Sequence, residues 1–387
     1  MTMAENKDKK VLNVPHLRFP EFSGEWEEHT LSQYLEFKNG LNPDAKRIGS
    51  GLPFISVMDI LSEGVINYDN IRGKVNATEK EIECFGVKDG DVLFQRSSET
   101  LEDVGRANVY MDNRTAIYGG FVIRGRKIGN YAPLFFKYLL ATPLARKRTC
   151  KMGAGAQHFN IGQEGLSKIS LYFPSIEEQR KIAGFLSLID ERIATQNKII
   201  EKYESLIKGL RVCCMQRVYG NNVHLSEIAQ IYQPQTISST ELTEDGFLVY
   251  GANGIIGKYK DYNHETEQIC ITCRGNTCGI VNYTKPMSWI TGNAMVINTD
   301  KYQDKVYKRY LYHFLSTYNF NSIISGSGQP QIVRTPLEKL KITLPPISEQ
   351  KQKAMILDRI QDKIDINHKV LNLYIRQKQY LLCQMFI

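Results

Sequence analysis

Two long stretches of the chain, residues 173–218 and 344–387, have apolar residues at helical spacing. The apolar positions recur every three or four residues, with charged residues between them. The seam of the first stretch comprises Ile182, Leu186, Ile189, Ile193, Ile200, Tyr203, Ile207, Leu210 and Cys214. Such a pattern, sustained over about four to five heptads, predicts a long helix with one narrow apolar seam. Because an isolated helix would leave this seam in water, each helix needs a partner.

The second stretch repeats the first at a constant offset of 171 residues, which indicates an internal repeat. The first copy begins with Ser175-Ile176-Glu177-Glu178, a capping-box pattern in which Ser175 and Glu178 satisfy backbone N–H groups. The second copy has Pro346 in place of this serine, and Lys378 interrupts its seam. Matching pairs are Glu178 and Glu349, Gln179 and Gln350, Ala183 and Ala354, Ile189 and Ile360, Tyr203 and Tyr374, Leu210 and Leu381.

Polar amides occupy equivalent places in the two seams, Gln196 in the first and Asn367 in the second. A polar seam residue fixes the register and the partner number of a helix pair at a cost in stability. Since a whole globular segment separates the two helices, we expect an antiparallel pair related by an approximate two-fold axis. Gln196 and Asn367 are then expected to set the register and to meet near that axis. The alternatives are a parallel pair, and two helices that each pack on their own domain.

Short apolar runs such as Phe54–Val57, bounded by Gly, Asn and Asp residues, predict strands over residues 53–123. Residues 132–150 have helical spacing, with Pro133 near the start and a break expected at Pro143. The second half replays this order, with a helical segment at 307–324. We therefore predict an α+β fold, in which two similar globular α/β domains are separated by two long antiparallel helices. The predicted segments are 1–172 with a disordered tail, 173–220, 221–343 and 344–387.

The composition of the 387 residues, 42% apolar and 23% charged, is that of an ordinary soluble globular protein. No run approaches the about 20 apolar residues that a membrane span needs, and the N-terminus lacks the apolar region of a secretory signal. The eight cysteines form no disulfide spacing pattern, which favours a cytoplasmic protein. A net charge of +8 is compatible with binding to nucleic acid or another anionic partner.

Nearly the whole chain after its first ten residues resembles the specificity subunit of type I restriction–modification systems. The resemblance rests on FPSIEEQRKIAGFLSLIDERI at 173–193, LPPISEQKQKAMILDRIQDKI at 344–364 and VPHLRFPEFSGEWEE at 14–28. It implies two target recognition domains, each of which reads one half of a split DNA sequence. It also implies that two modification subunits dock on the helical regions and that restriction subunits then join. S-adenosylmethionine and ATP are expected to be used by these partner subunits, with no cofactor bound by this chain.

The length of the predicted helices agrees with a split target. A continuous helix from Ile176 to Val218 would be roughly 60 Å long, at ~1.5 Å per residue. Two DNA readers held at the ends of such a rod would contact the duplex more than one turn (~34 Å) apart. If both domains bind DNA, the helices therefore predict a bipartite site with an unread spacer.

Two loops that follow predicted strands have side chains suited to base edges, since Arg pairs with guanine and Asn or Gln with adenine. We expect the two loops to occupy matching places, with Arg274 in the position of Arg96. Each glycine-rich link, 153–157 and 326–329, leads to further polar groups, and its backbone permits close approach to a phosphate. The alternative is that the two arginines pair with carboxylates of their own domains, and that the glycines only turn the chain. The basic run Arg146–Arg148 faces either phosphates or solvent. The candidate DNA-binding residues are Arg96, Ser97, Gln157 and His158 in the first domain and Arg274, Asn276, Gln329 and Gln331 in the second.

No catalytic motif accompanies these residues. The chain lacks the Asn/Asp-Pro-Pro-Tyr/Phe tetrapeptide of an adenine methyltransferase and a Walker A sequence. Cys270 and Cys273 lie in a predicted strand, where side chains three apart point to opposite faces, so we expect buried thiols and no metal site. We therefore predict a non-catalytic subunit that binds double-stranded DNA. The alternatives are a helical scaffold whose globular domains bind protein, and an enzyme with an unrecognised site.

Overall fold

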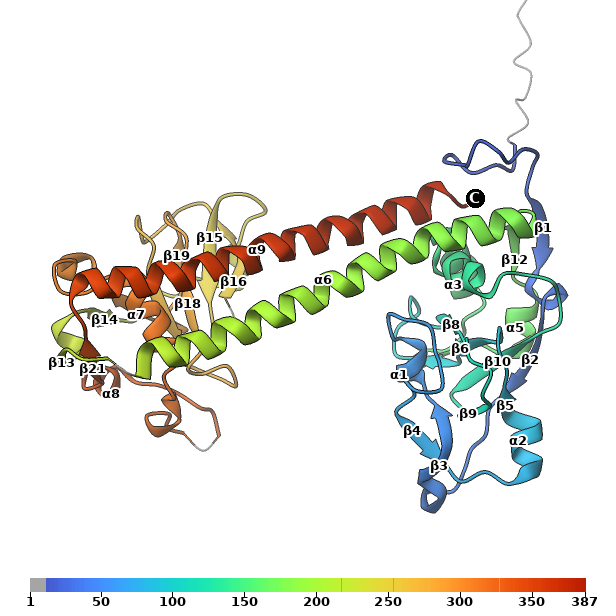
Figure 1. Cartoon of the computed structure of the whole chain (residues 1–387), viewed down its shortest axis with the longest axis horizontal. Coiled ribbons are helices and arrows are strands. Elements are labelled where there is room, and N and C mark those ends of the chain that lie inside the picture. The colour runs from blue at the N-terminus through green and yellow to red at the C-terminus, as the bar shows by residue number, and fades with distance from the viewer. Residues whose placement is uncertain (1–11, 217, 253, 327) are drawn as a thin grey trace, which may run out of the picture. The chain divides into compact units, whose positions relative to one another are not determined.

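A computed structural model describes residues 12–216, 218–252, 254–326 and 328–387, which form two compact units (Figure 1). Unit 1 comprises the described residues up to Gln196 together with Val370–Ile387, and unit 2 comprises those of Asn197–Lys369. Two long helices, α6 (Ile176–Gln216) and α9 (Ile347–Gln384), have residues in both units. The predicted disordered tail lies outside the described residues.

Unit 1 is built around an antiparallel sheet with the strand order β2-β10-β6-β8. A second sheet, β4-β3-β9-β5, contains the parallel pair of β3 and β9, while β1 pairs with β12 and β7 with β11. The strands are β1 (Glu27–Thr30), β2 (Leu35–Asn39), β3 (Ile48–Ile55), β4 (Gly73–Val75), β5 (Gly86–Val87), β6 (Val92–Gln95), β7 (Ser97–Ser98), β8 (Ala107–Val109), β9 (Ala116–Tyr118), β10 (Val122–Lys127), β11 (Phe159–Asn160) and β12 (Ser170–Phe173). The helices are α1 (Val57–Ile60), α2 (Glu79–Phe85), α3 (Pro133–Ala141), α4 (Pro143–Cys150) and α5 (Gln163–Ser167), with 3-10 turns η1 (Leu31–Gln33) and η2 (Ala45–Arg47).

Unit 2 repeats this topology with the antiparallel sheet β14-β20-β17-β18 and a second sheet, β16-β15-β19, whose pair β15 and β19 is parallel. Strand β13 pairs with β21, as β1 does with β12. The elements are β13 (Asn221–His224), β14 (Gln230–Tyr232), β15 (Phe247–Gly251), β16 (Gly254–Tyr259), β17 (Ile269–Thr272), β18 (Val281–Tyr283), β19 (Trp289–Ile290), β20 (Ala294–Asn298), β21 (Lys341–Leu344), α7 (Lys308–Leu315) and α8 (Arg334–Glu338), with 3-10 turns η3 (Leu225–Glu227), η4 (Ser239–Glu241), η5 (Asp300–Tyr302) and η6 (Phe320–Ser322). The predicted internal repeat and α+β fold are confirmed.

Both faces of the central sheet of unit 1 are buried. Because alternate residues of a strand point to opposite sides, they enter two different cores. On strand β6, Val92 and Phe94 belong to the core that includes Phe135 of α3 and the start of α6. Leu93 belongs to the core on the other face, with Ile55 of the second sheet. This two-sided burial explains why the first three residues of β6 are apolar, while its last residue, Gln95, is polar and buried.

Proline and serine residues set the local boundaries of the helices in unit 1. Pro133 is the first residue of α3, and the predicted break at Pro143 is confirmed, because Thr142 separates α3 from α4. The predicted strand at 54–57 is wrong after Ile55, since Ser56 caps the short helix α1. In unit 2 the predicted helical segment at 307–324 is likewise shorter, because α7 ends at Leu315.

The two long helices pair in antiparallel fashion within each unit, as predicted (Figure 1). In unit 1, Leu186 near the start of α6 shares one core with Leu381 near the end of α9. In unit 2, Ile207 near the end of α6 shares a core with Leu357 near the start of α9. Among the described residues, no helix is long and apolar enough to cross a membrane.

Two polar seam residues of α9, Lys378 and Asn367, have local partners. Lys378 forms an ion pair of 2.6 Å with Asp190 of α6, which compensates its charge within the seam of unit 1. Gln196 is buried, and Asn367 is half-buried and donates to the backbone oxygen of Lys363. Because these two amides belong to different units, their meeting stays a prediction.

A buried glutamine joins each long helix to the first helix that follows the sheet. In unit 1, the Oε1 of Gln179 accepts the backbone N–H of Ala132, and its Nε2 donates to the oxygen of Pro174. In unit 2, the Oε1 of Gln350 accepts the N–H of Tyr307 at 2.8 Å, and its Nε2 donates to the backbone oxygens of Lys305 and Pro345. The glutamine of the repeated Glu-Gln pair thus satisfies backbone groups at the start of α3 and α7.

The predicted capping box at the start of α6 is only half present. The Oγ of Ser175 accepts the N–H of Glu178 at 3.3 Å, as predicted. The Glu178 carboxylate, however, forms a bidentate pair with Arg18, at 2.8 and 2.7 Å, and does not reach back to the helix start. A fork of two charge-assisted hydrogen bonds is stronger than a single bond to a backbone amide, so the buried carboxylate joins the N-terminal segment to α6.

A buried histidine network links α6, α7 and α9 in unit 2. The Nε of Arg211 donates to Nδ1 of His313 at 3.1 Å, so the other ring nitrogen, Nε2, carries the proton and donates to Asp358 at 2.8 Å. Protonation of Nδ1 would place its N–H against the N–H of the Arg211 Nε. Burial lowers the pKa of His313, in agreement with a neutral ring.

Replacement of Gln350 by Leu is expected to destabilise unit 2 by about 2–3 kcal/mol, because the N–H of Tyr307 loses its acceptor and the buried oxygen of Pro345 loses its donor. Urea unfolding followed by circular dichroism measures the change. Gln352→Leu is the matched control, since Gln352 is exposed on the same helix, and its effect should stay within about 0.5 kcal/mol. Equal effects of the two substitutions would contradict the assigned role of Gln350.

The free energy of unfolding is expected to decrease as the pH falls below the unfolded pKa of histidine, about 6.5. The pKa of His313 is lower in the folded state, so the unfolded chain binds a proton that the folded chain refuses. Urea unfolding at pH 7.5 and 5.5 should therefore show a smaller pH-dependent loss in His313→Gln. The control His368→Gln, which removes an exposed histidine, should keep the wild-type loss.

Candidate DNA interface

The end of strand β6 brings the predicted residues of unit 1 together. Arg96 and Ser97 follow β6 directly, and β7 pairs Ser97 with Asn160 of β11. The Ser97 hydroxyl also forms a hydrogen bond with the Asn160 side chain, and the backbone N–H of Ile161 donates to the oxygen of Arg96. These contacts place the strand end beside the glycine-rich link at 153–157.

The glycine-rich link forms a tight turn that presents two polar residues. Gly155 has a φ of 143°, and a Cβ at this position would overlap the backbone oxygen of His158. Ala154 pairs with Asn160 across the base of the turn, which leaves Gln157 and His158 exposed at its tip. Glycine is therefore required here for the turn itself.

Unit 2 contains the equivalent arrangement at the end of β17. Arg274 forms a bridge with Gln331, and Gln331 also pairs with Ser325 across a turn that begins at Gly326, whose φ is 95°. Gln329 is exposed on this turn, and Asn276 is exposed in the loop after Arg274. We call the two sets of residues the strand-end clusters: Arg96, Ser97, Gln157, His158 and Asn160 in unit 1, and Arg274, Asn276, Gln329 and Gln331 in unit 2.

The backbone hydrogen bonds show which residues of the two clusters are equivalent. The correspondence differs by one residue from the one predicted from the sequence. The N–H of Arg96 donates to Phe121, and the N–H of Cys273 donates to Asn293 in the same way. Cys273 is thus the equivalent of Arg96, and Arg274 is the equivalent of Ser97. The predicted match of Arg96 with Arg274 is therefore wrong. The difference matters, since a shift of one residue along a strand turns side chains to the opposite face.

Asn160 is a polar residue that the sequence reasoning missed. It is exposed and corresponds to Gln331, because each forms the bridge at the base of its glycine turn. The offset of 171 residues that relates the long helices also relates these two positions, so the repeat itself contained the signal.

The two arginines differ in their surroundings, and neither forms an ion pair within the described residues. Arg96 is half-buried and donates to the backbone oxygen of Gly120 at 3.4 Å. Arg274 is exposed, and its guanidinium donates no hydrogen bond to any residue that the structure describes. The expected alternative, pairing with carboxylates of the same domain, is therefore not observed.

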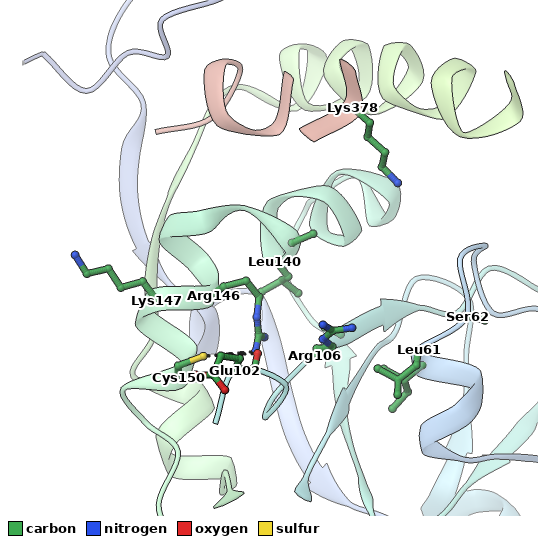
Figure 2. Close-up of a pocket in the computed structure, with 12 residues that line it drawn as sticks. Leu61, Ser62, Glu102, Arg106, Leu140, Arg146, Lys147, Cys150 and Lys378 are labelled. Carbon is green, nitrogen blue, oxygen red and sulfur yellow. Dashed lines mark hydrogen bonds between the residues drawn. The ribbon is translucent and has the colours of Figure 1, made fainter. Parts of the chain in front are cut away.

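The basic run Arg146–Arg148 is largely used by the fold of unit 1. Figure 2 shows Arg146 directed toward Glu102, to whose backbone oxygen it donates at 2.8 Å. Arg148 pairs with Glu28 at 2.6 Å. Lys147 is exposed at the edge of a cavity of about 550 Å³, and in Figure 2 its side chain extends away from the other lining residues. Only this lysine of the run is left for an external anion.

Two cysteines of unit 2, Cys270 and Cys273, are buried thiols. Cys270 and Cys273 belong to different cores on opposite faces of the sheet, and burial raises the pKa of Cys270 to about 12. The Sγ of Cys273 accepts a hydrogen bond from Gln233. Within the described residues, no group of three or more His, Cys, Asp or Glu side chains is placed to hold a metal ion.

Comparison with known proteins identifies the family of this fold. The model of the type I restriction modification DNA specificity domain matches residues 23–205 and 221–373. A putative type I restriction enzyme MjaX specificity subunit of Methanocaldococcus jannaschii is 25% identical over 406 residues, which cover 93% of this chain and 92% of the relative. The type I restriction enzyme EcoprrI specificity subunit of Escherichia coli is 31% identical over 147 residues, 37% of this chain and 36% of that subunit.

A solved structure has the same fold over nearly its full length. The crystal structure of the type I restriction–modification system S subunit from M. genitalium superposes with a TM-score of 0.65 at 17% identity, covering 97% of this chain and 99% of that one. Because the family model matches both halves of the chain, the resemblance seen in the sequence is confirmed, and the protein belongs to the family of type I restriction–modification DNA specificity subunits.

Proposed function

We propose that this chain reads a bipartite DNA target, with one half-site for each unit. The observation that supports the proposal is the repeated strand-end cluster, which has an arginine and exposed amide groups beside a glycine turn in both units. Arginine and amide side chains are those that discriminate guanine and adenine in the major groove. Because the two clusters have different side chains on equivalent backbone, the two half-sites are expected to differ in sequence.

On this proposal the chain supplies recognition, and partner subunits supply chemistry. Two modification subunits would use S-adenosylmethionine to methylate adenine, and restriction subunits would use ATP. Helices α6 and α9, which have residues in both units, would set the spacing of the half-sites and offer the docking regions for the modification subunits.

The substitution Arg274→Ala is expected to relax base preference in one half-site and to leave the other unchanged. Loss of a bidentate contact to guanine corresponds to about 1–3 kcal/mol. Selection from random duplexes by the chain assembled with its modification subunits measures the preference. The control Lys301→Ala removes an exposed charge in η5. This turn follows the end of β20 that lies away from the strand-end cluster, so both half-sites should stay unchanged.

The same assembly should bind duplex DNA less tightly as salt increases, because phosphate contacts release counterions. An adaptor whose globular domains bind only protein would show no binding to duplex DNA at any salt concentration. That result would contradict the proposed function and favour the adaptor.

Insertion of one heptad into both long helices, at 196/197 in α6 and 369/370 in α9, should lengthen the unread spacer. Seven residues preserve the seam register and add about 10 Å, close to three base pairs at 3.4 Å each. Sequencing of the methylated sites should show unaltered half-sites. Altered half-sites with an unchanged spacer would contradict the role of the helices as a ruler.

A further inference from the structure

The turn between β9 and β10 in unit 1 has a structural equivalent in unit 2, the turn between β19 and β20. The backbone N–H of Gly119 donates to the oxygen of Ile55, the last residue of β3, at 3.0 Å. The N–H of Thr291 donates to the oxygen of Tyr250, the residue before the last of β15, at 2.9 Å. Two positions later, the oxygens of Phe121 and Asn293 accept the strand-end N–H groups of Arg96 and Cys273, at 2.9 and 3.1 Å. Phe121 and Asn293 therefore occupy the same place in their units.

A glycine fixes the backbone before each of these residues. A Cβ at Gly120 would overlap the side chain of Asn42, and a Cβ at Gly292 would overlap the Oγ1 of Thr236. In both units the overlapping residue follows the outer strand of the central sheet, β2 or β14. Any larger side chain would require Asn42 or Thr236 to move, so glycine allows each turn to lie close against these residues.

The side chains held in this way point out of the fold. Phe121 is 68% exposed, and Asn293 is exposed as well. A single exposed apolar residue is common on protein surfaces. Phe121, however, lies beside the strand-end cluster, since its oxygen accepts the N–H of Arg96 and the guanidinium of Arg96 reaches the oxygen of Gly120.

We propose that Phe121 and Asn293 are equivalent base-contacting residues, one in each half-site. Phenylalanine makes apolar contact with the 5-methyl group of thymine in the major groove, whereas asparagine binds the N6 and N7 edge of adenine. The two units would thus read an A·T pair at matching places by different chemistry. This inference rests on the proposed reading of DNA by both strand-end clusters.

The test uses the chain assembled with its modification subunits and a pool of random-sequence duplexes. The wild type should enrich a bipartite sequence. Phe121→Ala should lose preference for one A·T pair in one half-site and bind the wild-type duplex about tenfold more weakly. Phe121→Tyr keeps the ring and should keep the preference. Asn293→Ala should lose an adenine in the other half-site alone.

Base analogues test the chemistry directly. Deoxyuridine in place of the thymine removes the methyl group and should weaken binding of the wild type but not of Phe121→Ala. 7-Deazaadenine removes N7 and should weaken the wild type but not Asn293→Ala. The control Ile128→Ala removes another exposed apolar residue, 59% exposed, which follows the opposite end of strand β10, and should match the wild type.

The outcomes separate this inference from the function on which it rests. If the wild type enriches no sequence, the proposed function is wrong, and this inference is wrong with it. If the wild type enriches a bipartite sequence but Phe121→Ala and Asn293→Ala select the same sequence with the same affinity, this inference alone is overturned. Preference lost at a G·C pair would likewise overturn the assigned chemistry.

Discussion

Burial of the seams of α6 and α9 is the constraint on which each unit depends. Each seam continues into the core beneath the central sheet, so the long helices and the globular part share one interior. Gln179 and Gln350 lie at this junction, where their amides satisfy backbone groups that burial removes from water. A globular part joined in this way cannot rotate freely on the helix ends that belong to its own unit.

On this shared framework, the two units keep the same backbone and change the side chains. The strand-end N–H, the glycine turn and the bridge at its base are all repeated, while Arg96 corresponds to Cys273 and Ser97 to Arg274. Backbone hydrogen bonds do not depend on side-chain identity, so the fold tolerates this divergence. Such a repeat would suit the proposed reading of two different half-sites with one architecture.

The charge of the chain is a poor guide to its binding surface. Arg18, Arg146 and Arg148 all have partners inside unit 1, where they hold distant segments together. Arg274 is exposed and makes no such contact within the described residues. A basic residue whose hydrogen bonds the fold already uses has fewer left for an external anion, and a sequence does not show which residues those are.

The sequence alone determined the features that depend on local periodicity and backbone chemistry. The two long helices, the break at Pro143 and the internal repeat could be predicted because helical spacing and proline act over a few residues. Only the tertiary structure decided which residues correspond at the ends of β6 and β17 and which partner Glu178 takes. Short strands have no register of their own, since pairing across a sheet fixes it, and Arg18 lies 160 residues from Glu178. The exposure of Phe121 likewise follows from packing of its turn against Asn42, a contact that no local pattern encodes.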